Sequence, residues 1–200
     1  MKTFALLLFQ MLVFGRIALA QQSENIKYFD TRNRPISEKR FKEKRATNQV
    51  LDIIGDSINH LKLIEREENG QFADYANLIS ALEKASGKKM DAEKPLVIIY
   101  YPGKDKCNET ISLPKFTSYY RSLQKQLDAH IIFVYKDFDG STGNNPDKWI
   151  KDPEALVEKS FFKYHYPCLS FVAIAKTGEY SSYFGEFPPS FVEKAVKAVQ

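Results

Sequence analysis

Apolar runs and amphipathic stretches alternate through the second half of the chain. Residues 96–101 and 131–135 are almost wholly apolar, which is typical of strands that a sheet buries on both faces. Between them, apolar side chains recur every three or four residues from Phe116 to Leu127 and predict a helix with Ser112 as its N-cap. After a Gly- and Asn-rich loop at 139–146, we expect a second helical stretch, which carries Trp149, Leu156, Val157, Phe161 and Phe162.

The last part of the chain has the pattern of a hairpin followed by a helix. Strands are predicted at 169–175 and 180–184, a turn at 176–178 joins them, and Pro188-Pro189 opens the final helix. From residue 96 the order is therefore strand, helix, strand, helix, strand, strand, helix. This order indicates an α/β domain.

Residues before Pro95 have a different pattern, with short strands and polar turns. We expect one hairpin from residues 26–30 and 36–41 and a second pair of strands at 50–54 and 60–65, closed by Asn69-Gly70. An amphipathic helix follows and ends near Gly87, with Phe72, Tyr75, Leu78, Ile79 and Leu82 on one stripe. This part therefore predicts a small antiparallel sheet plus a helix, either as an independent unit or as an elaboration of the domain that follows.

The first twenty residues have the three-part pattern of a secretory signal. Lys2 supplies the positive charge, the apolar run from Phe4 to Phe14 is too short to span a bilayer, and Ala18-Leu19-Ala20 is a small-x-small cleavage pattern. Arg16 weakens the alternative of a membrane anchor. We therefore expect cleavage near Ala20 and a secreted or periplasmic protein without stable membrane insertion.

These boundaries divide the chain into a leader at 1–20, a hairpin and helix extension at 21–90, and a domain at 91–200. The apolar fraction of 44% is enough to bury a core, which excludes a wholly disordered or collagen-like chain. Loss of the leader removes two cations and no acid, so the net charge falls from +4 to +2. Such a balance argues against nucleic acid as a partner.

Export changes the interpretation of the two cysteines, Cys107 and Cys168. Thiols outside the cytoplasm tend to oxidise, so a structural disulfide and a redox-active pair are both favoured over two unpaired thiols. A bond between them would close a loop of 61 steps and stabilise the fold by roughly 4 kcal/mol in the chain-entropy model. That gain alone is sufficient reason for a purely structural bridge.

The element order and two landmarks resemble the thioredoxin fold. Cys107 lies in the loop after the first strand of the domain, where that family carries its reactive cysteine, and Pro167 lies where the family has a cis-proline before the hairpin. The resemblance covers about residues 91–200 and implies a three-layer domain with a central mixed sheet. It also implies that the loop of Cys107 packs against Pro167, which would place Cys107 and Cys168 close enough to bridge.

The chemistry of such a site depends on Cys107. Lys104, Lys106 and a helix N-terminus just downstream would favour its thiolate form. However, the C-x-x-C pair of the thioredoxin family is absent, because Lys104 and Thr110 occupy the two possible partner positions.

Two hypotheses for the function follow. In the first, Cys107 is the nucleophile and Cys168 the resolving cysteine of a thiol-disulfide oxidoreductase, Pro167 shapes the groove, and a protein thiol or disulfide is the substrate. In the second, the domain is a non-catalytic binding or scaffold module with a structural Cys107–Cys168 disulfide.

A weaker resemblance links residues 100–107 to the peroxiredoxin loop, where an aromatic residue and proline precede the peroxidatic cysteine. That family has a threonine shortly before its cysteine, whereas this chain has Lys104 and Asp105 there. A peroxidase lacking a hydroxyl to orient the peroxide lacks a geometric requirement of the reaction. Peroxidase activity is therefore less favoured than disulfide exchange.

Other patterns carry weaker signals. The histidines, His60, His130 and His165, are dispersed along the chain. Because there are also only two cysteines, no structural zinc site or other cofactor is expected. His165 lies near Pro167 and could tune the pKa of a thiol there. Residues 137–141 resemble the start of a calcium loop, but Thr142 and Lys148 occupy the positions where such a loop needs Gly and Glu. The basic run at 39–45 is interpreted as a solvated strand edge. Asn108-Glu109-Thr110 is an N-glycosylation acceptor sequence in hosts that glycosylate exported proteins.

Overall fold

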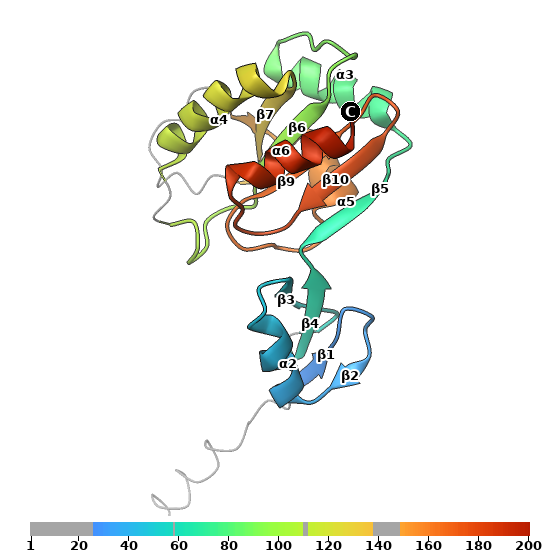
Figure 1. Cartoon of the computed structure of the whole chain (residues 1–200), viewed down its shortest axis with the longest axis vertical. Coiled ribbons are helices and arrows are strands. Elements are labelled where there is room, and N and C mark those ends of the chain that lie inside the picture. The colour runs from blue at the N-terminus through green and yellow to red at the C-terminus, as the bar shows by residue number, and fades with distance from the viewer. Residues whose placement is uncertain (1–25, 58, 110–111, 138–148) are drawn as a thin grey trace, which may run out of the picture.

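A six-stranded mixed sheet organises the larger part of the molecule (Figure 1). The computed structural model describes residues 26–57, 59–109, 112–137 and 149–200. The strand order is β5-β10-β9-β6-β7-β8. The strands are β5 Glu67–Gln71, β6 Leu96–Tyr101, β7 His130–Tyr135, β8 Ile150–Lys151, β9 Ser170–Ile174 and β10 Glu179–Tyr183. β6 pairs in parallel with β7 and antiparallel with β9, which confirms the predicted α/β architecture with a central mixed sheet.

Helices cover both faces of this sheet. They are α3 Tyr75–Ser86, α4 Leu113–Leu127, α5 Leu156–Phe161 and α6 Pro189–Ala198, with a 3₁₀ turn η1 at Pro153–Ala155 before α5. Odd-numbered residues of β6 pack in a hydrophobic cluster with α4 and α6, and its even-numbered residues pack in a second cluster with α3 and α5. Every residue of β6 is buried, which explains why its apolar run is continuous.

The aromatic stretch after the 139–146 loop is less helical than predicted. Trp149 precedes β8, which pairs with the end of β7, and α5 begins only at Leu156. The Trp149 side chain is 2% exposed, and its Nε1 donates a hydrogen bond to Thr117 Oγ1 at 2.7 Å. The apolar residues there include core positions outside the helix, which periodicity alone did not distinguish.

A second, smaller sheet precedes the larger one. It has the order β2-β1-β4-β3, with β1 Lys27–Phe29, β2 Pro35–Ile36, β3 Val50–Ile54 and β4 His60–Glu65. The predicted β3–β4 pair is confirmed, but β1 pairs with β4 in parallel, so the expectation of a wholly antiparallel sheet is wrong. Its cluster of buried side chains is small and consists of Phe41, Val50 and Leu63.

The segment predicted as a strand at 36–41 is mostly a helix. Helix α2 spans Glu38–Arg45, and the Ser37 side chain caps it by accepting a hydrogen bond from the Arg40 N–H at 3.3 Å. Glu38 and Lys42 form an ion pair one turn apart. Phe41 is its one buried residue, so the basic run lies on the exposed side of a helix rather than on a strand edge. The cap and the i,i+4 pair outweigh the short hairpin pattern.

The Asn69-Gly70 dipeptide does not close a strand. Both residues lie inside β5, which pairs with β10 and joins the edge of the larger sheet. Gly70 lies opposite Tyr180, and a Cβ at Gly70 would approach the Tyr180 ring to 2.8 Å. Glycine is required here for close approach of an aromatic ring rather than for a turn. β5 and α3 thus pack with elements that follow residue 91.

The two sheets meet where β4 runs into β5 (Figure 1). At this junction the Arg66 guanidinium donates to the Phe184 carbonyl at 3.3 Å, and the Phe184 N–H donates to the Arg66 carbonyl at 2.8 Å. A Cβ on Gly185 would lie 3.1 Å from both the Arg66 side chain and a Leu51 methyl. The small sheet therefore packs directly against the segment that follows β10.

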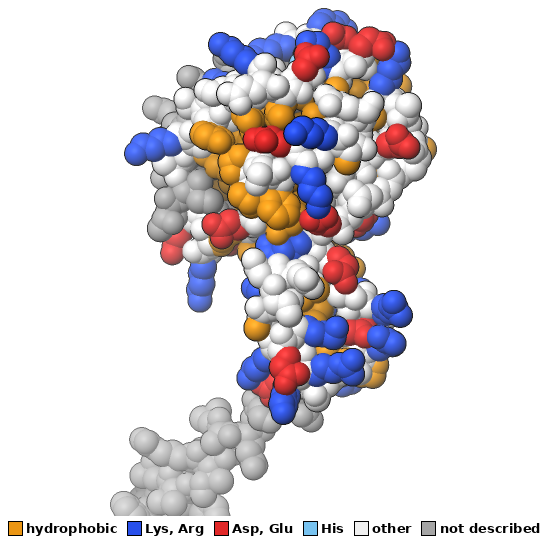
Figure 2. Space-filling model, viewed as in Figure 1, with side chains coloured by type: hydrophobic (Ala, Val, Ile, Leu, Met, Phe, Trp, Pro, Cys, Tyr) orange, Lys and Arg blue, Asp and Glu red, His pale blue; other side chains and the backbone are white. Residues whose placement is uncertain are grey.

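The predicted leader at 1–20 and the loop at 139–146 lie outside the described residues. No helix among the described residues is long and apolar enough to cross a membrane. Figure 2 shows hydrophobic side chains gathered in a band on the face where α6 lies. On α4 and α6, Phe116 and Phe191 are only partly buried, and Tyr119 is 53% exposed.

Candidate functional site

A disulfide joins Cys107, in the loop after β6, to Cys168, just before β9. Because β6 and β9 are antiparallel neighbours and Tyr100 pairs with Ser170, the end of one strand and the start of the other lie at the same edge of the sheet. The two Cα atoms are 5.0 Å apart, within the range of about 4.4–6.8 Å that a disulfide requires. The expected proximity of the two cysteines is thereby confirmed.

The two halves of this disulfide differ in exposure. Cys107 is exposed, whereas Cys168 is 2% exposed. Cys107 lies in a turn in which the Glu109 N–H donates to the Asp105 carbonyl, and α4 begins only at Leu113. The predicted helix with Ser112 as its N-cap is thereby confirmed, and its first residue lies six positions after Cys107.

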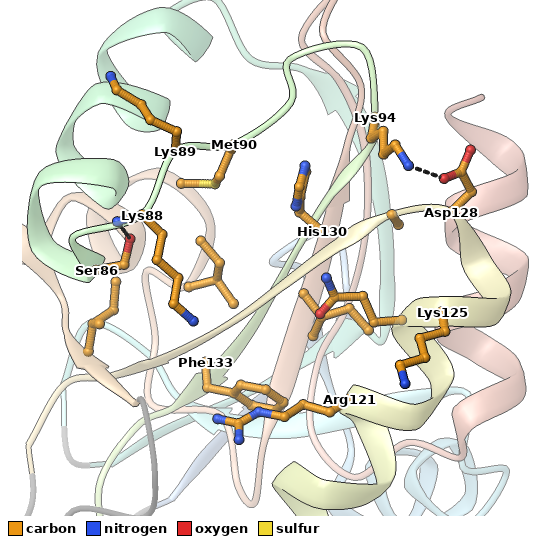
Figure 3. A pocket seen from close by; sticks show the side chains of 15 residues that line it. Ser86, Lys88, Lys89, Met90, Lys94, Arg121, Lys125, Asp128, His130 and Phe133 are labelled. Carbon is orange, nitrogen blue, oxygen red and sulfur yellow. Dashed lines mark hydrogen bonds and ion pairs between the residues drawn. The ribbon is translucent and has the colours of Figure 1, made fainter.

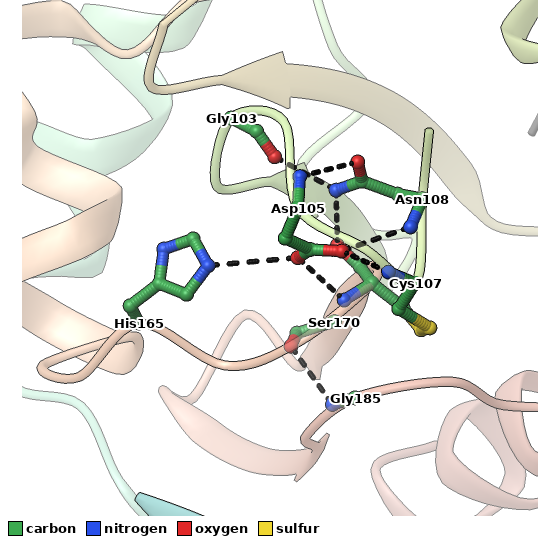
Figure 4. A network of polar contacts seen from close by, with 8 residues as sticks. Gly103, Asp105, Cys107, Asn108, His165, Ser170 and Gly185 are labelled. Atoms are coloured by element: carbon green, nitrogen blue, oxygen red, sulfur yellow. Dashed lines mark hydrogen bonds and ion pairs between the residues drawn. A yellow bond between two sulfur atoms is a disulfide. The ribbon is translucent and has the colours of Figure 1, made fainter. Parts of the chain in front are cut away.

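Asp105 connects the two loops independently of the sulfur atoms (Figure 4). Its Oδ1 accepts hydrogen bonds from the N–H groups of Cys107 and Asn108, both at 2.8 Å, and its Oδ2 accepts one from the N–H of Cys168 at 2.9 Å. Hydrogen bonds to an ionised acceptor are the stronger kind. A carboxylate with three backbone donors therefore holds both cysteine-bearing segments in place.

The Asn108 side chain completes this network. It is 4% exposed, and its Nδ2 donates to the Gly103 carbonyl at 2.7 Å and to the Cys168 carbonyl at 3.3 Å. Its Oδ1 accepts from the Asp105 N–H at 2.9 Å. Nδ2 is the atom that a glycan would occupy, so the folded protein has no room for one at the acceptor sequence.

Pro167 follows a trans peptide bond, since no cis bond occurs among the described residues, and the expected cis-proline is wrong. The chain turns instead at Cys168, whose φ is +68°, in the left-handed region that few non-glycine residues adopt. Tyr166 anchors the segment: its ring stacks on Phe184 with centroids 4.3 Å apart, and burial raises the pKa of its hydroxyl. The cysteines are brought together without the cis bond.

His165 approaches the network from the side away from the disulfide (Figure 4). Its Nε2 lies 3.5 Å from Asp105 Oδ2, and its side chain is 54% exposed. Lys104 and Lys106, the predicted cations beside Cys107, are both exposed. Because His165 lies next to the Asp105 carboxylate, its charge can influence the cysteine-bearing segments through the hydrogen bonds of Asp105.

Glu186 is an acidic group close to the disulfide. A carboxylate oxygen of Glu186 and the two sulfurs lie within 4.8 Å of one another. The neighbouring Gly185 is fixed because its N–H donates to the buried Ser170 hydroxyl at 3.1 Å. These three side chains are the metal-ligand set found among the described residues, and with the disulfide closed its sulfurs are not the thiolates that metals prefer.

A separate hollow lies at the opposite end of the larger sheet, beside the start of β7 (Figure 3). It has a volume of about 670 Å³ and an apolar floor that includes Ile131 and Phe133. Its rim carries cationic side chains: Lys88, Lys89, Lys94, Arg121 and Lys125. Lys94 pairs there with Asp128, and His130 Nε2 accepts from the Asp91 N–H at 2.9 Å.

Sequence reasoning found the cysteines but missed Asp105, Glu186 and the role of Asn108. Asp105 did leave a local signal. An aspartate that accepts hydrogen bonds from the N–H groups two and three residues later, here those of Cys107 and Asn108, is typical of an Asx turn. Glu186 left none, since it is 79 and 18 residues from the two cysteines and approaches them only through the β9–β10 hairpin.

No family model matches this chain, and no match was found among curated proteins or solved structures.

Proposed function

We propose that this is an exported thioredoxin-like protein whose Cys107–Cys168 disulfide exchanges with protein thiols at Cys107. The observation that carries the proposal is the unequal exposure of the disulfide, with Cys107 open to solvent and Cys168 buried. An incoming thiolate is therefore expected to attack the sulfur of Cys107, with the sulfur of Cys168 as the leaving atom. Support for the fold comes from the order β10-β9-β6-β7, with a parallel central pair and an antiparallel hairpin, as the resemblance implies.

The exchange balances in two steps. A substrate thiolate attacks the sulfur of Cys107, the Cys107–Cys168 bond breaks, and Cys168 leaves as a thiolate that takes up a proton. A second substrate thiol then attacks the substrate sulfur of the mixed disulfide, which releases Cys107 as a thiol. The substrate loses two electrons and two protons in total, and the protein gains them as two thiols.

The surface next to the disulfide suits a protein substrate. Phe187 directly follows Glu186 and lies against Phe116, with ring centroids 6.4 Å apart. Tyr119, on the next part of α4, is 53% exposed. Apolar surface therefore begins close to the sulfurs, and such patches are typical of interaction sites.

Trapping of mixed disulfides tests the proposal with a matched pair of variants. In Cys168→Ser, the exposed Cys107 should capture a thiol-reactive peptide or native substrate, and the adduct should persist because no resolving thiol is left. In Cys107→Ser, the buried Cys168 should capture at least tenfold less. Equal capture by both variants would remove the basis of the proposal.

A structural clamp is the second candidate, and the Asp105 network favours it because that network holds the same two loops without chemistry. The reduction potential separates the two functions. Exchange predicts a potential between about −270 and −120 mV, whereas a clamp predicts one below about −300 mV. Equilibration against glutathione and dithiothreitol buffers measures it.

A further inference from the structure

We propose that the reduced form of this protein binds one zinc ion through Cys107, Cys168 and Glu186. The disulfide form holds the three ligand atoms within 4.8 Å of one another but offers no thiolate. Opening the bond turns the same atoms into two thiolates and a carboxylate, which are ligands that Zn²⁺ accepts. The site requires only an open disulfide, whether or not a protein substrate opens it.

The distances suit a zinc ion after a small adjustment. Zn–S bonds of about 2.3 Å and Zn–O bonds of about 2.0–2.2 Å place tetrahedral ligand atoms roughly 3.5–4 Å from one another. Reduction lets the two sulfurs separate to about that spacing. From a starting distance of up to 4.8 Å, the Glu186 oxygen has to move about 1 Å closer to the sulfurs. Glu186 is exposed, so its side chain is free to make that movement.

The backbone around the three ligands is held by contacts that do not involve sulfur. Asp105 accepts hydrogen bonds from the N–H groups of both cysteines. The Ser170 hydroxyl accepts one from the N–H of Gly185, which directly precedes Glu186. Phe187, on the other side of Glu186, is buried against Phe171. The ligand-bearing segments are therefore expected to keep their positions when the disulfide opens, as a preformed metal site requires.

The coordination would leave one position open. His165 lies on the far side of Asp105 from the sulfurs, so three protein ligands face the metal and water takes the fourth place (Figure 4). Three protein ligands plus water is the arrangement of zinc sites that keep an open position, as catalytic sites do, rather than of closed structural ones.

The redox and proton balance is explicit. A dithiol reductant gives two electrons and two protons to the disulfide and becomes a disulfide itself. Zn²⁺ then displaces the two thiol protons and binds the thiolates. When a small-molecule disulfide reoxidises the cysteines, its own S–S bond breaks, it takes two electrons from the thiolates and two protons from water to become two thiols, the Cys107–Cys168 bond forms again, and Zn²⁺ is released.

Zinc titration of the whole chain in both redox states tests this site. The protein is reduced with tris(2-carboxyethyl)phosphine, desalted without oxygen, checked for folding by circular dichroism, and titrated with Zn²⁺ against a chromophoric chelator. The expected stoichiometry is one zinc per reduced chain, with no binding to the oxidised chain. Co²⁺ in place of Zn²⁺ should give a thiolate-to-metal charge-transfer band.

Two glutamate variants identify the oxygen ligand. Glu186→Gln should weaken zinc binding by about tenfold or more, because loss of even a hydrogen-bond partner of a ligand typically costs about 10–100-fold in metal affinity. Glu193→Gln on α6 makes the same change of charge outside the ligand set and should leave binding within about twofold. Equal binding by Glu186→Gln and the unaltered chain would overturn the proposal, as would half a zinc per chain or equal binding to both redox states. None of these readouts depends on mixed-disulfide trapping, so exchange at Cys107 can fail or succeed separately.

Discussion

The two sheets of this molecule are stabilised in different ways. The six-stranded sheet is covered by helices on both faces, and each face has its own large cluster of buried side chains. The four-stranded sheet has one helix, α2, and a cluster of only three fully buried residues. Leu51 and Ile53 of its β3 are buried in a cluster of the larger sheet instead. The small sheet therefore depends on its neighbour, whereas the larger sheet has one cluster, with α4 and α6, that is built wholly from its own part of the chain.

Removal of the disulfide should have the largest effect, because it destabilises the larger sheet, on which the small sheet depends. The double variant Cys107→Ala/Cys168→Ala should lose about 4 kcal/mol of stability, because a cross-link over 61 residues restricts the unfolded chain. Urea unfolding followed by Trp149 fluorescence measures this loss, since the single tryptophan is buried in the larger part. A loss below about 1 kcal/mol would mean that the Asp105 network alone sets the positions of both loops.

A matched pair of leucine truncations tests whether the small sheet unfolds separately. Leu63 and Leu78 are both 0% exposed, the first in the small sheet and the second in the larger core. Each change to alanine should cost about 3 kcal/mol. In Leu63→Ala, hydrogen exchange should accelerate in β1–β4 while β6 and β9 stay protected. In Leu78→Ala, protection from hydrogen exchange should fall in both sheets. The same pattern of exchange in both variants would show that the two sheets unfold as a single cooperative unit.

The junction between the sheets predicts a smaller loss. Gly185 has φ +80°, and an added Cβ would lie 3.1 Å from Arg66 and Leu51. Gly185→Ala should therefore cost about 1–2 kcal/mol through backbone strain and crowding. Thermal unfolding measures the loss. Gly87→Ala at the C-cap of α3 is the control, because its φ is also positive but a Cβ there would meet nothing within 4 Å. A larger loss in Gly87→Ala would show that contact between the sheets contributes little at this point.

The smallest expected effect is a titration within the small sheet. Asp30 accepts hydrogen bonds from the Arg34 guanidinium and from the N–H groups of Arg34 and Arg32, which lower the pKa of its carboxyl to about 2. A lowered folded-state pKa means that the stabilisation is complete above the unfolded value of 3.8 and is lost as the pH falls toward 2. Carboxyl ¹³C NMR of Asp30 should show this midpoint, and Arg34→Gln should raise it. An unchanged midpoint in Arg34→Gln would exclude the guanidinium as the cause.

The comparison between the sheets also shows what the amino-acid sequence predicts well. In the larger sheet, β6, β7 and the β9–β10 hairpin followed from apolar runs, because burial on both faces leaves little ambiguity in the pattern. In the small sheet, a single buried Phe41 could not distinguish a strand from α2, and the Ser37 cap settled the outcome. Long-range pairing was the other gap, since nothing near Asn69-Gly70 indicates that Tyr180 lies opposite.

The same distinction applies at the site. The pairing of Cys107 with Cys168 was predicted because a resemblance placed two loops together. The trans bond before Pro167 and the approach of Glu186 were not, because both depend on how the loop before β9 and the segment after β10 pack. Local sequence carries little information about such packing.

The buried amide of Asn108 has a consequence for how the protein is produced. Oligosaccharide transfer acts on nascent chains, before the Asn108 amide is enclosed between the Gly103 and Cys168 carbonyls. A sugar attached at that moment would persist through folding and keep the turn at Cys107 from closing on the segment that carries Cys168. When a glycosylating host exports the chain, the product should therefore divide into an unmodified, disulfide-bonded fraction that is secreted and a glycosylated fraction that quality control retains. A bacterial expression host avoids this division, and a comparison of the masses of the secreted and the retained protein reveals it.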